Sequence, residues 1–221
     1  MTIFQEYVFP AASNNNIALL QLPVGGINFI LNGSLVNTKG TINFKDDYGF
    51  VPRITATCAN DISTRNIVIE GKQNGIYIVD SFTAPTAGAT VISNFCFDEI
   101  YKIYMDGVIV RTVSIGTSGV GYFPLIRLNT LKRDVPNLNY ALNMMVAAAN
   151  PATYQVFLSL KDSYNQGTYD SLTAANNNFI APAVAANASA LLQYTQLASN
   201  ILIKVTPNAN GTILKAQFMQ L

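Results

Sequence analysis

The stretch from Phe50 to Gly116 constrains the fold more than any other part of the chain. It consists of short runs of β-branched and aromatic residues, and each run is closed by Asn, Asp, Gly or Pro. Such runs are typical of β-strands, because branched and aromatic side chains pack well on a pleated surface. The closing residues favour turns. We therefore expect an all-β protein with little helix.

Two dipeptides predict hairpins in this stretch. Asn74-Gly75 and Asp106-Gly107 each stand between two strand runs. Both central positions of a type I′ turn need positive φ, which Asn, Asp and Gly adopt most readily. The strands expected in the first half are Ile17–Leu22, Ile27–Leu31, Gly40–Phe44, Arg53–Cys58, Asn66–Glu70, Ile76–Phe82, Thr90–Phe97, Glu99–Met105 and Val108–Ile115.

The strand expected at Glu99–Met105 shows how the side chains are predicted to divide between two faces. Successive residues of a strand point to opposite sides. Strict alternation puts Tyr101 with Ile103 on one face. It puts Lys102 with Tyr104 on the other. This pattern favours an antiparallel strand with one buried side.

The strand pattern restarts after Thr117–Gly121, which we interpret as a junction or linker. The region Tyr169–Leu197 is rich in Ala, Leu and Asn, and we expect loops with a short strand there. A helical turn near Ala188–Leu192 is the alternative interpretation of that part of the region. The strands expected in the second half are Leu138–Val146, Ala152–Lys161, Ile201–Val205 and Leu214–Met219, with Asn210-Gly211 as the turn between the last two.

These patterns predict two tandem antiparallel β-sandwich domains, jelly-roll-like or Ig-like. The first would span residues 17–120 and the second residues 121–221. Residues 1–16 are expected to form an N-terminal arm, because Phe9-Pro10 is followed by a polar stretch that ends in three asparagines. A single larger sandwich or jelly roll is the alternative, since counting strands does not separate the two architectures.

The composition argues against several partners. Charged residues make up 11% of the chain, against roughly 25% in an average domain. The net charge is +1 and the nearest thing to a basic patch is Lys132-Arg133, so we expect no nucleic-acid partner. The N-terminus has no basic region followed by an apolar run, and no run approaches the ~20 apolar residues of a spanning helix. We therefore expect neither a secretory signal nor a membrane partner.

The chain contains no His and no Trp. Hydrolysis by Ser-His-Asp or Cys-His groups needs an imidazole, and so do metal sites built on His. A zinc site of four thiolates is ruled out because Cys58 and Cys96 are the only cysteines. We expect both to be buried free thiols.

The remaining candidates for chemistry each have an ordinary structural interpretation, which we favour. The pairs Asp46-Asp47 and Asp98-Glu99 are neighbours and would point to opposite faces of a strand. Gly116–Gly121 lacks the helix start and the Lys-Ser/Thr pair of a phosphate loop. A loop with calcium-type ligands lacks the spacing and the closing Glu of an EF-hand. Its residues are Asp162, Ser163, Asn165 and Asp170.

Tyrosine is frequent, with 11 residues, and tyrosine rings can stack on sugars. We favour packing on sheet faces and at interfaces. The tyrosines on or near expected strands are Tyr101, Tyr104, Tyr154, Tyr164 and Tyr169. The sequence therefore nominates no catalytic, cofactor-binding or metal-binding residue, and no cofactor.

The layout from Arg53 to Gly107 resembles that of the small all-β structural proteins of tailed-bacteriophage virions. A strand opens at Arg53 and Thr55, and the next strand ends in Gly71 before Asn74-Gly75. The second half is similar more loosely, through an Ala/Asn-rich return and a last strand. The residues that carry the rest of the likeness are Asn60, Asp61, Ser63, Pro85, Ala87, Gly88, Phe95, Phe97, Ile100, Ile103, Ala174–Asn187 and Gln220-Leu221.

The resemblance implies a non-enzymatic virion protein, either a capsid decoration (cement) protein or a neck or tail accessory. Such a protein would be assembled into the virion in the host cytoplasm as a homo-oligomer, bound to the major capsid, tail or neck proteins. The arm at residues 1–16 could become ordered on a neighbouring subunit. The alternatives are a host-receptor or glycan-binding module of a fibre and, third, a glycosidase that uses two carboxylates.

Overall fold

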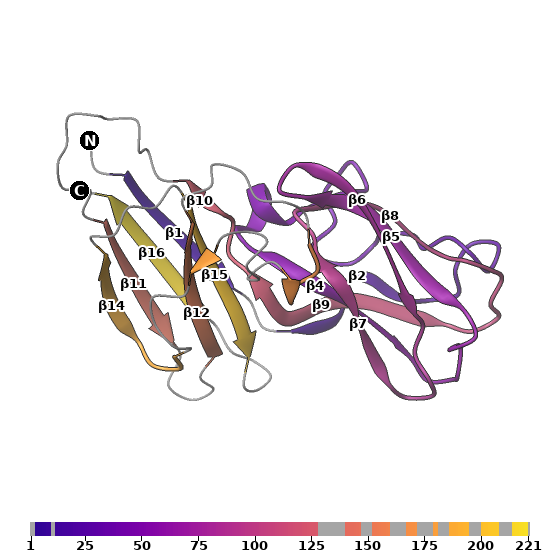
Figure 1. Cartoon of the computed structure of the whole chain (residues 1–221). Helices are drawn as coiled ribbons and strands as arrows, with labels where there is room; N and C mark the ends of the chain where they lie inside the picture. The colour runs from indigo at the N-terminus through magenta and orange to yellow at the C-terminus, as the bar shows by residue number, and fades with distance from the viewer. Residues whose placement is uncertain are drawn as a thin grey trace. The chain divides into compact units, whose positions relative to one another are not determined.

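The structure is a computed structural model of the chain. It describes residues 3–9, 12–127, 140–146, 152–159, 167–171, 179–180, 186–194, 200–207 and 214–220. This part of the chain consists mainly of antiparallel sheets (Figure 1), which confirms the predicted all-β class. The longest helical element within it is a five-residue π-helical turn, η1 (Phe44–Tyr48).

The chain divides into two compact units. Unit 1 comprises Met1–Ala11, Tyr48–Phe50 and Gly119–Leu221, and unit 2 comprises Ala12–Asp47 and Val51–Ser118. Each unit therefore combines segments that are far apart in the sequence, instead of taking one continuous stretch.

Unit 2 contains a four-stranded antiparallel sheet with the strand order β3-β8-β5-β6. A second set of strands consists of β7, β4, the first part of β9 and β2, paired in that order. The bounds are β2 (Ser13–Gln21), β3 (Ile42–Asn43), β4 (Val51–Cys58), β5 (Asn66–Gln73), β6 (Ile76–Thr83), β7 (Thr90–Cys96), β8 (Glu99–Met105) and β9 (Val113–Tyr122).

The core of unit 2 is made of side chains from both sets of strands. Among its fully buried side chains are Ile54, Ile67, Ile69, Ile100 and Ile115. Two polar side chains of the four-stranded sheet also point inward and bind the backbone of β7. The Asp80 carboxylate accepts the N–H of Asn94, and the Gln73 amide donates to the carbonyl of Cys96.

Unit 1 contains a four-stranded sheet with the order β1-β16-β11-β14, and a second group in which β15 pairs with β10, β12 and the end of β9. Phe9 packs against Phe50 and Phe123, with ring centroids 5.4 and 5.8 Å apart. The bounds are β1 (Ile3–Phe9), β10 (Ile126–Arg127), β11 (Tyr140–Val146), β12 (Ala152–Ser159), β13 (Phe179–Ile180), β14 (Ala190–Tyr194), β15 (Asn200–Pro207) and β16 (Leu214–Gln220).

The N-terminal arm expected at residues 1–16 is not observed in the described part of that stretch, residues 3–9 and 12–16. Ile3–Phe9 forms β1 and pairs with β16 along its whole length, from Ile3 opposite Gln220 to Phe9 opposite Leu214. The asparagines after it belong to β2. The Asn16 amide binds both the backbone N–H and the hydroxyl of Thr117, so a side chain that suggests a loop completes a strand pair here.

The hairpin predicted at Asn74-Gly75 is confirmed. β5 and β6 pair from Gln73 opposite Ile76, and the φ angles of Asn74 and Gly75 are +52° and +77°. The hairpin predicted at Asp106-Gly107 is wrong, because β8 and β9 belong to different sheets. Both edges of β8 are already paired, one with β5 and the other with β3, so the chain leaves the sheet after β8.

Three other local predictions also need correction. Thr117–Gly121 is not a loop linker, since it lies inside the continuous strand β9, but the division between the two units does fall within it, between Ser118 and Gly119. Ile27–Leu31 forms no strand, and Asn28 makes two isolated bridges, one to Val24 and one to Tyr104. Ala188–Leu192 forms no helical turn, since β14 begins at Ala190 and pairs with β11. The turn expected at Asn210-Gly211 lies outside the described residues.

Candidate functional site

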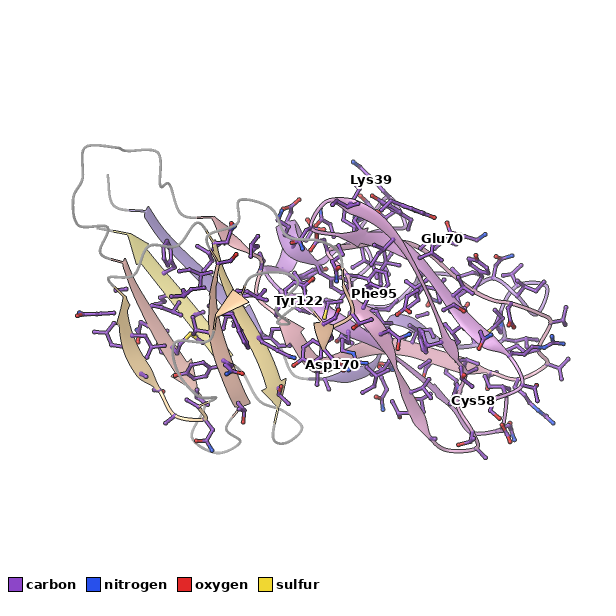
Figure 2. The ribbon with its side chains drawn as sticks, viewed as in Figure 1. Lys39, Cys58, Glu70, Phe95, Tyr122 and Asp170 are labelled. Atoms are coloured by element: carbon purple, nitrogen blue, oxygen red, sulfur yellow. The ribbon has the colours of Figure 1, made fainter. Side chains whose placement is uncertain are left out.

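The outer face of the β3-β8-β5-β6 sheet carries tyrosines and paired charges, and we call it the tyrosine face. Its residues come from the outward positions of β5, β6 and β8. The strand register places them in cross-strand rows. Glu70, labelled in Figure 2, belongs to the middle strand of the three. The tyrosine face consists of Val68, which is itself buried, and of Glu70, Lys72, Tyr77, Val79, Ser81, Glu99, Tyr101, Lys102 and Tyr104.

A β-bulge brings Tyr101 onto this face. Gly71 lies opposite Ile100 and Glu70 lies opposite Lys102, so Tyr101 is the extra residue of β8. The alternation predicted from the sequence, with Tyr101 and Tyr104 on opposite faces, is therefore wrong. A bulge inserts one residue and resets the alternation beyond it. As a result Ile100 and Ile103 are both buried, while Tyr101 is 38% exposed.

Hydrogen bonds link the tyrosines to the charged residues of the face. The Tyr77 hydroxyl donates to a Glu70 carboxylate oxygen at 3.0 Å, and the Tyr101 hydroxyl donates to Glu99 at 2.6 Å. The Lys72 ammonium lies 3.1 Å from the same Glu99 oxygen and 5.4 Å from the centre of the Tyr101 ring. The side chains are thus held in defined positions.

Lys102 makes a second lysine–tyrosine contact, further along β8. Its ammonium lies 4.6 Å from the centre of the Tyr104 ring, within the range of a cation–π contact. On β5, Glu70 stands opposite Lys102, as Lys72 stands opposite Glu99. The face therefore carries two lysines and two glutamates and has no net charge.

These contacts also keep the charge pattern stable around neutral pH. Hydrogen bonds to Tyr101 and Glu99 raise the pKa of Lys72 above its usual value. Partial desolvation, followed by the hydrogen bond to Glu70, raises the pKa of Tyr77. Desolvation and the hydrogen bond to Glu99 do the same for the pKa of Tyr101. At pH 7 the lysine is charged and both phenols are neutral.

Unit 2 also exposes a group of apolar side chains, which we call the apolar rim. Each of them is more than half exposed. They lie on three segments: the end of β2 with the residues after it, the loop before β3, and the loop between β8 and β9. The apolar rim consists of Leu20, Leu22, Val24, Ile30, Val108 and Val110.

Hydrogen bonds hold these three segments side by side. The Gln21 side chain donates to the Ile30 carbonyl at 2.8 Å and accepts the Ile30 N–H at 3.0 Å. The Ile109 N–H donates to the Gly26 carbonyl at 2.9 Å, and the side chain of Val108 lies over Gly26. Because polar contacts fix the backbone, the exposed apolar side chains belong to an ordered surface.

The structure separates the neighbouring carboxylates Asp98 and Glu99, as expected for residues on opposite sides of a strand. Asp98 is buried, and one carboxylate oxygen accepts the Gly75 N–H at 2.9 Å. Burial raises the pKa of Asp98 to about 6, although the bond from Gly75 and the nearby Lys45 oppose this. The Asp98 carboxylate therefore binds the backbone of the β5–β6 turn.

The other acidic residues considered as candidates for chemistry are exposed or lie beside a polar or charged side chain. Asp46 and Asp47 are exposed in η1, and the Asp46 carboxylate accepts a hydrogen bond from Asn43 at 2.9 Å. Asp170 lies 3.9 Å from the Lys204 ammonium. The other residues of the expected calcium-type loop, Asp162, Ser163 and Asn165, lie outside the described residues. Within the described ranges, no three Cys, Asp or Glu side chains gather as metal ligands would.

The cysteines and most of the remaining tyrosines singled out in the sequence are buried. Cys58 and Cys96 are buried free thiols, as predicted. Tyr154 and Tyr169 are buried in unit 1, while Tyr164 lies outside the described residues. No helix in the part of the chain that the structure describes has the length and apolarity needed to cross a bilayer.

Comparison of the chain with protein-family models, with curated proteins and with solved structures found no match.

Neither surface was nominated from the sequence. The signal for the apolar rim is the run Leu19-Leu20-Gln21-Leu22, which has more apolar residues than an alternating strand with one buried face needs. The signal for the tyrosine face was hidden by the bulge, since Tyr101 and Tyr104 were assigned to opposite faces.

Proposed function

We propose that this protein is a non-enzymatic structural component of a tailed-phage virion, which binds copies of itself and the head or tail shell. The apolar rim is the observation that carries the proposal. Exposed apolar patches on a folded domain commonly mark surfaces that bind another protein. Six aliphatic side chains, each more than half exposed, sit on a backbone that hydrogen bonds hold in place.

The composition and the sheet architecture support a role in assembly. With 11% charged residues the chain has few groups that oppose broad protein contacts, and without His it lacks the commonest acid–base group. We further infer that each unit is an antiparallel β-sandwich. In unit 2, the inward Asp80 and Gln73 of one sheet bind the backbone of β7, as facing layers of a sandwich would.

Within a particle, many identical weak contacts provide firm attachment. When one contact of a ring or lattice has formed, the next forms at a high effective concentration. The apolar rim can therefore be effective even if one copy binds one shell subunit weakly. We assign the rim to the contact with the shell and locate the protein in the virion.

Incorporation into particles tests this proposal. Purified full-length protein is added to purified virions made without it, and bound copies per particle are counted after sedimentation. The wild-type chain should saturate the particles at a fixed copy number. Leu20→Asp and Val110→Asp should lower occupancy at least about tenfold, because each buries a charge in the contact.

Leu191→Asp is the matched control. Leu191 is 64% exposed, close to the 65% of Leu20, but it lies on β14 of unit 1. This variant should bind like the wild type, and circular dichroism should show all three variants folded. Wild-type protein that does not associate with the particles would overturn the proposal. Equal occupancy by the rim variants and the wild type would remove the apolar rim from it.

A host-receptor or glycan-binding module of a fibre is the second candidate. It is favoured by one observation, the half-exposed rings of Tyr77 and Tyr101 on one rigid face. Aromatic rings at such positions can stack on sugars. Binding of the isolated protein to a glycan array or to host cells, lost in Tyr77→Ala, would support this function in place of the first.

A further inference from the structure

We propose that the tyrosine face binds the same face of a second copy of this chain, about a twofold axis in the plane of the sheet. This inference deepens the proposed function by naming the self-contact that it includes. It depends on the pattern of charges across β5, β6 and β8, which is a different observation from the apolar rim.

The strand register arranges the face in two adjacent rows. In the first row, Tyr77, Lys72 and Glu99 stand side by side on β6, β5 and β8. The second row runs in the same strand order. It consists of Val79, Glu70 and Lys102. On both β5 and β8, the charge changes sign from the first row to the second. Rows on one face are two residues apart, about 7 Å.

A twofold axis that runs across the strands, midway between the two rows, exchanges the rows between facing copies. Lys72 of each copy then lies over Glu70 of the other, and Glu99 lies over Lys102. On the remaining strand the Tyr77 ring meets Val79. All four charges of each face thus meet an opposite charge, and the two apolar positions meet each other.

The same pattern disfavours other arrangements. An axis along β5 would place Glu70 over Glu70 and Lys72 over Lys72, and like charges in contact are unfavourable. A strongly acidic or basic partner gains little from a face with two lysines and two glutamates. Two sheets that pack face to face with nearly parallel strand axes are a common arrangement in proteins. The geometry therefore points to a second copy as the partner.

The contact should be weak and salt-dependent. The face offers about ten side chains, fewer than the roughly 20–30 residues per partner of a standard interface. Lys72 and Glu99 already pair within one copy at 3.1 Å, so dimerisation extends this pair into a larger network. Weak self-association of this kind suits a protein that is held in place by many neighbours.

Charge exchange in the full-length chain tests the proposal. In Glu70→Lys the introduced lysine faces Lys72 of the second copy, and in Lys72→Glu the introduced glutamate faces Glu70. Each variant alone should weaken self-association at least about tenfold. In a mixture of the two variants, both pairs have opposite charges again. The mixture should associate within about threefold of the wild-type dissociation constant.

Sedimentation velocity over a concentration series measures these constants, at about 50 mM salt, where screening is weak. Lys39→Glu and Asp47→Lys make the same charge changes at exposed positions outside the face and should associate like the wild type. Recovery in the mixture cannot come from unfolded chains, so it separates a direct contact from a folding defect.

Two results would overturn the inference: a wild-type chain that stays monomeric throughout the series, or a mixture no tighter than the single variants. Either result leaves the particle-binding test of the apolar rim in force, because the rim variants keep the tyrosine face intact. Conversely, if self-association follows the charges but the particles take up no protein, the self-contact stands and the virion assignment fails.

Discussion

Asp98 should make the stability of unit 2 depend on pH. Its carboxylate is buried beside the β5–β6 turn, where it accepts the Gly75 N–H at 2.9 Å. Burial favours the neutral acid and raises the pKa of Asp98 from its ordinary 3.8 to about 6. The Asp98→Asn substitution keeps an oxygen that can accept the Gly75 N–H, and it removes the titration.

The size of the effect follows from the two pKa values. The difference between 3.8 in the unfolded chain and about 6 in the folded chain corresponds to roughly 3 kcal/mol. Because the folded chain binds this proton more tightly, protonation stabilises the fold. The contribution is fully present below about pH 3.8 and is lost as the pH rises through about 6. Asn is neutral throughout, so the variant lacks this dependence.

Urea unfolding followed by circular dichroism, at pH 4 and at pH 7.5 and constant ionic strength, measures the difference. The free energy of unfolding of Asp98→Asn minus that of the wild type should be about 2–3 kcal/mol higher at pH 7.5 than at pH 4, because only the wild type loses stability between these two pH values. The comparison between variant and wild type cancels the titration of the other carboxylates.

Asp61→Asn is the matched control. Asp61 is exposed, and a hydrogen bond from the Ser63 backbone lowers its pKa below the ordinary 3.8. The stability that Asp61 contributes is present above pH 3.8 and is lost as the pH falls through its lowered pKa, so the difference between this variant and the wild type should change little between pH 7.5 and pH 4. If Asp98→Asn shifts stability equally at pH 4 and pH 7.5, the argument from burial is refuted.

Two further substitutions test how the sheets of unit 2 are joined. Asp80→Asn should lower the free energy of unfolding by about 2 kcal/mol. One carboxylate oxygen accepts the N–H groups of Asn94 and Phe95, the other accepts the Asn94 side-chain amide, and an amide in place of Asp80 has only one oxygen. A neutral or stabilising result in urea unfolding would contradict this role. Gly71→Ala should cost about 3 kcal/mol, since an added Cβ meets the Glu99 carbonyl oxygen across the bulge. Loss of less than about 1 kcal/mol in the same assay would show that the backbone there can move.

Local features of the sequence predicted one hairpin turn, most strands and the burial of the cysteines correctly. Asn74-Gly75 formed the expected hairpin because positive φ at two successive residues is a property of those residues themselves. Most strands appeared where β-branched and aromatic runs predicted them, with bounds that differ by a few residues. The two cysteines are buried, in agreement with the usual preference of free thiols.

Predictions that depended on distant partners failed. Asp106-Gly107 has the composition of a hairpin turn, but both edges of β8 are paired with other strands. Residues 1–16 were interpreted as an arm, yet β1 finds its partner in β16 at the other end of the chain. No local pattern contains this information, since each pairing depends on which strand edges the rest of the fold leaves open.

The sequence by itself determined the all-β class, the positions of most strands and the scarcity of acid–base groups, because these follow from side-chain shape and composition. Only the tertiary structure decided which surfaces the protein presents. The bulge at Tyr101 depends on how β8 is paired with β5, and it brings Tyr101 and Tyr104 onto one face. The apolar rim depends on hydrogen bonds between three separate segments. Both surfaces result from contacts between residues far apart in the chain, and short-range alternation does not record such contacts.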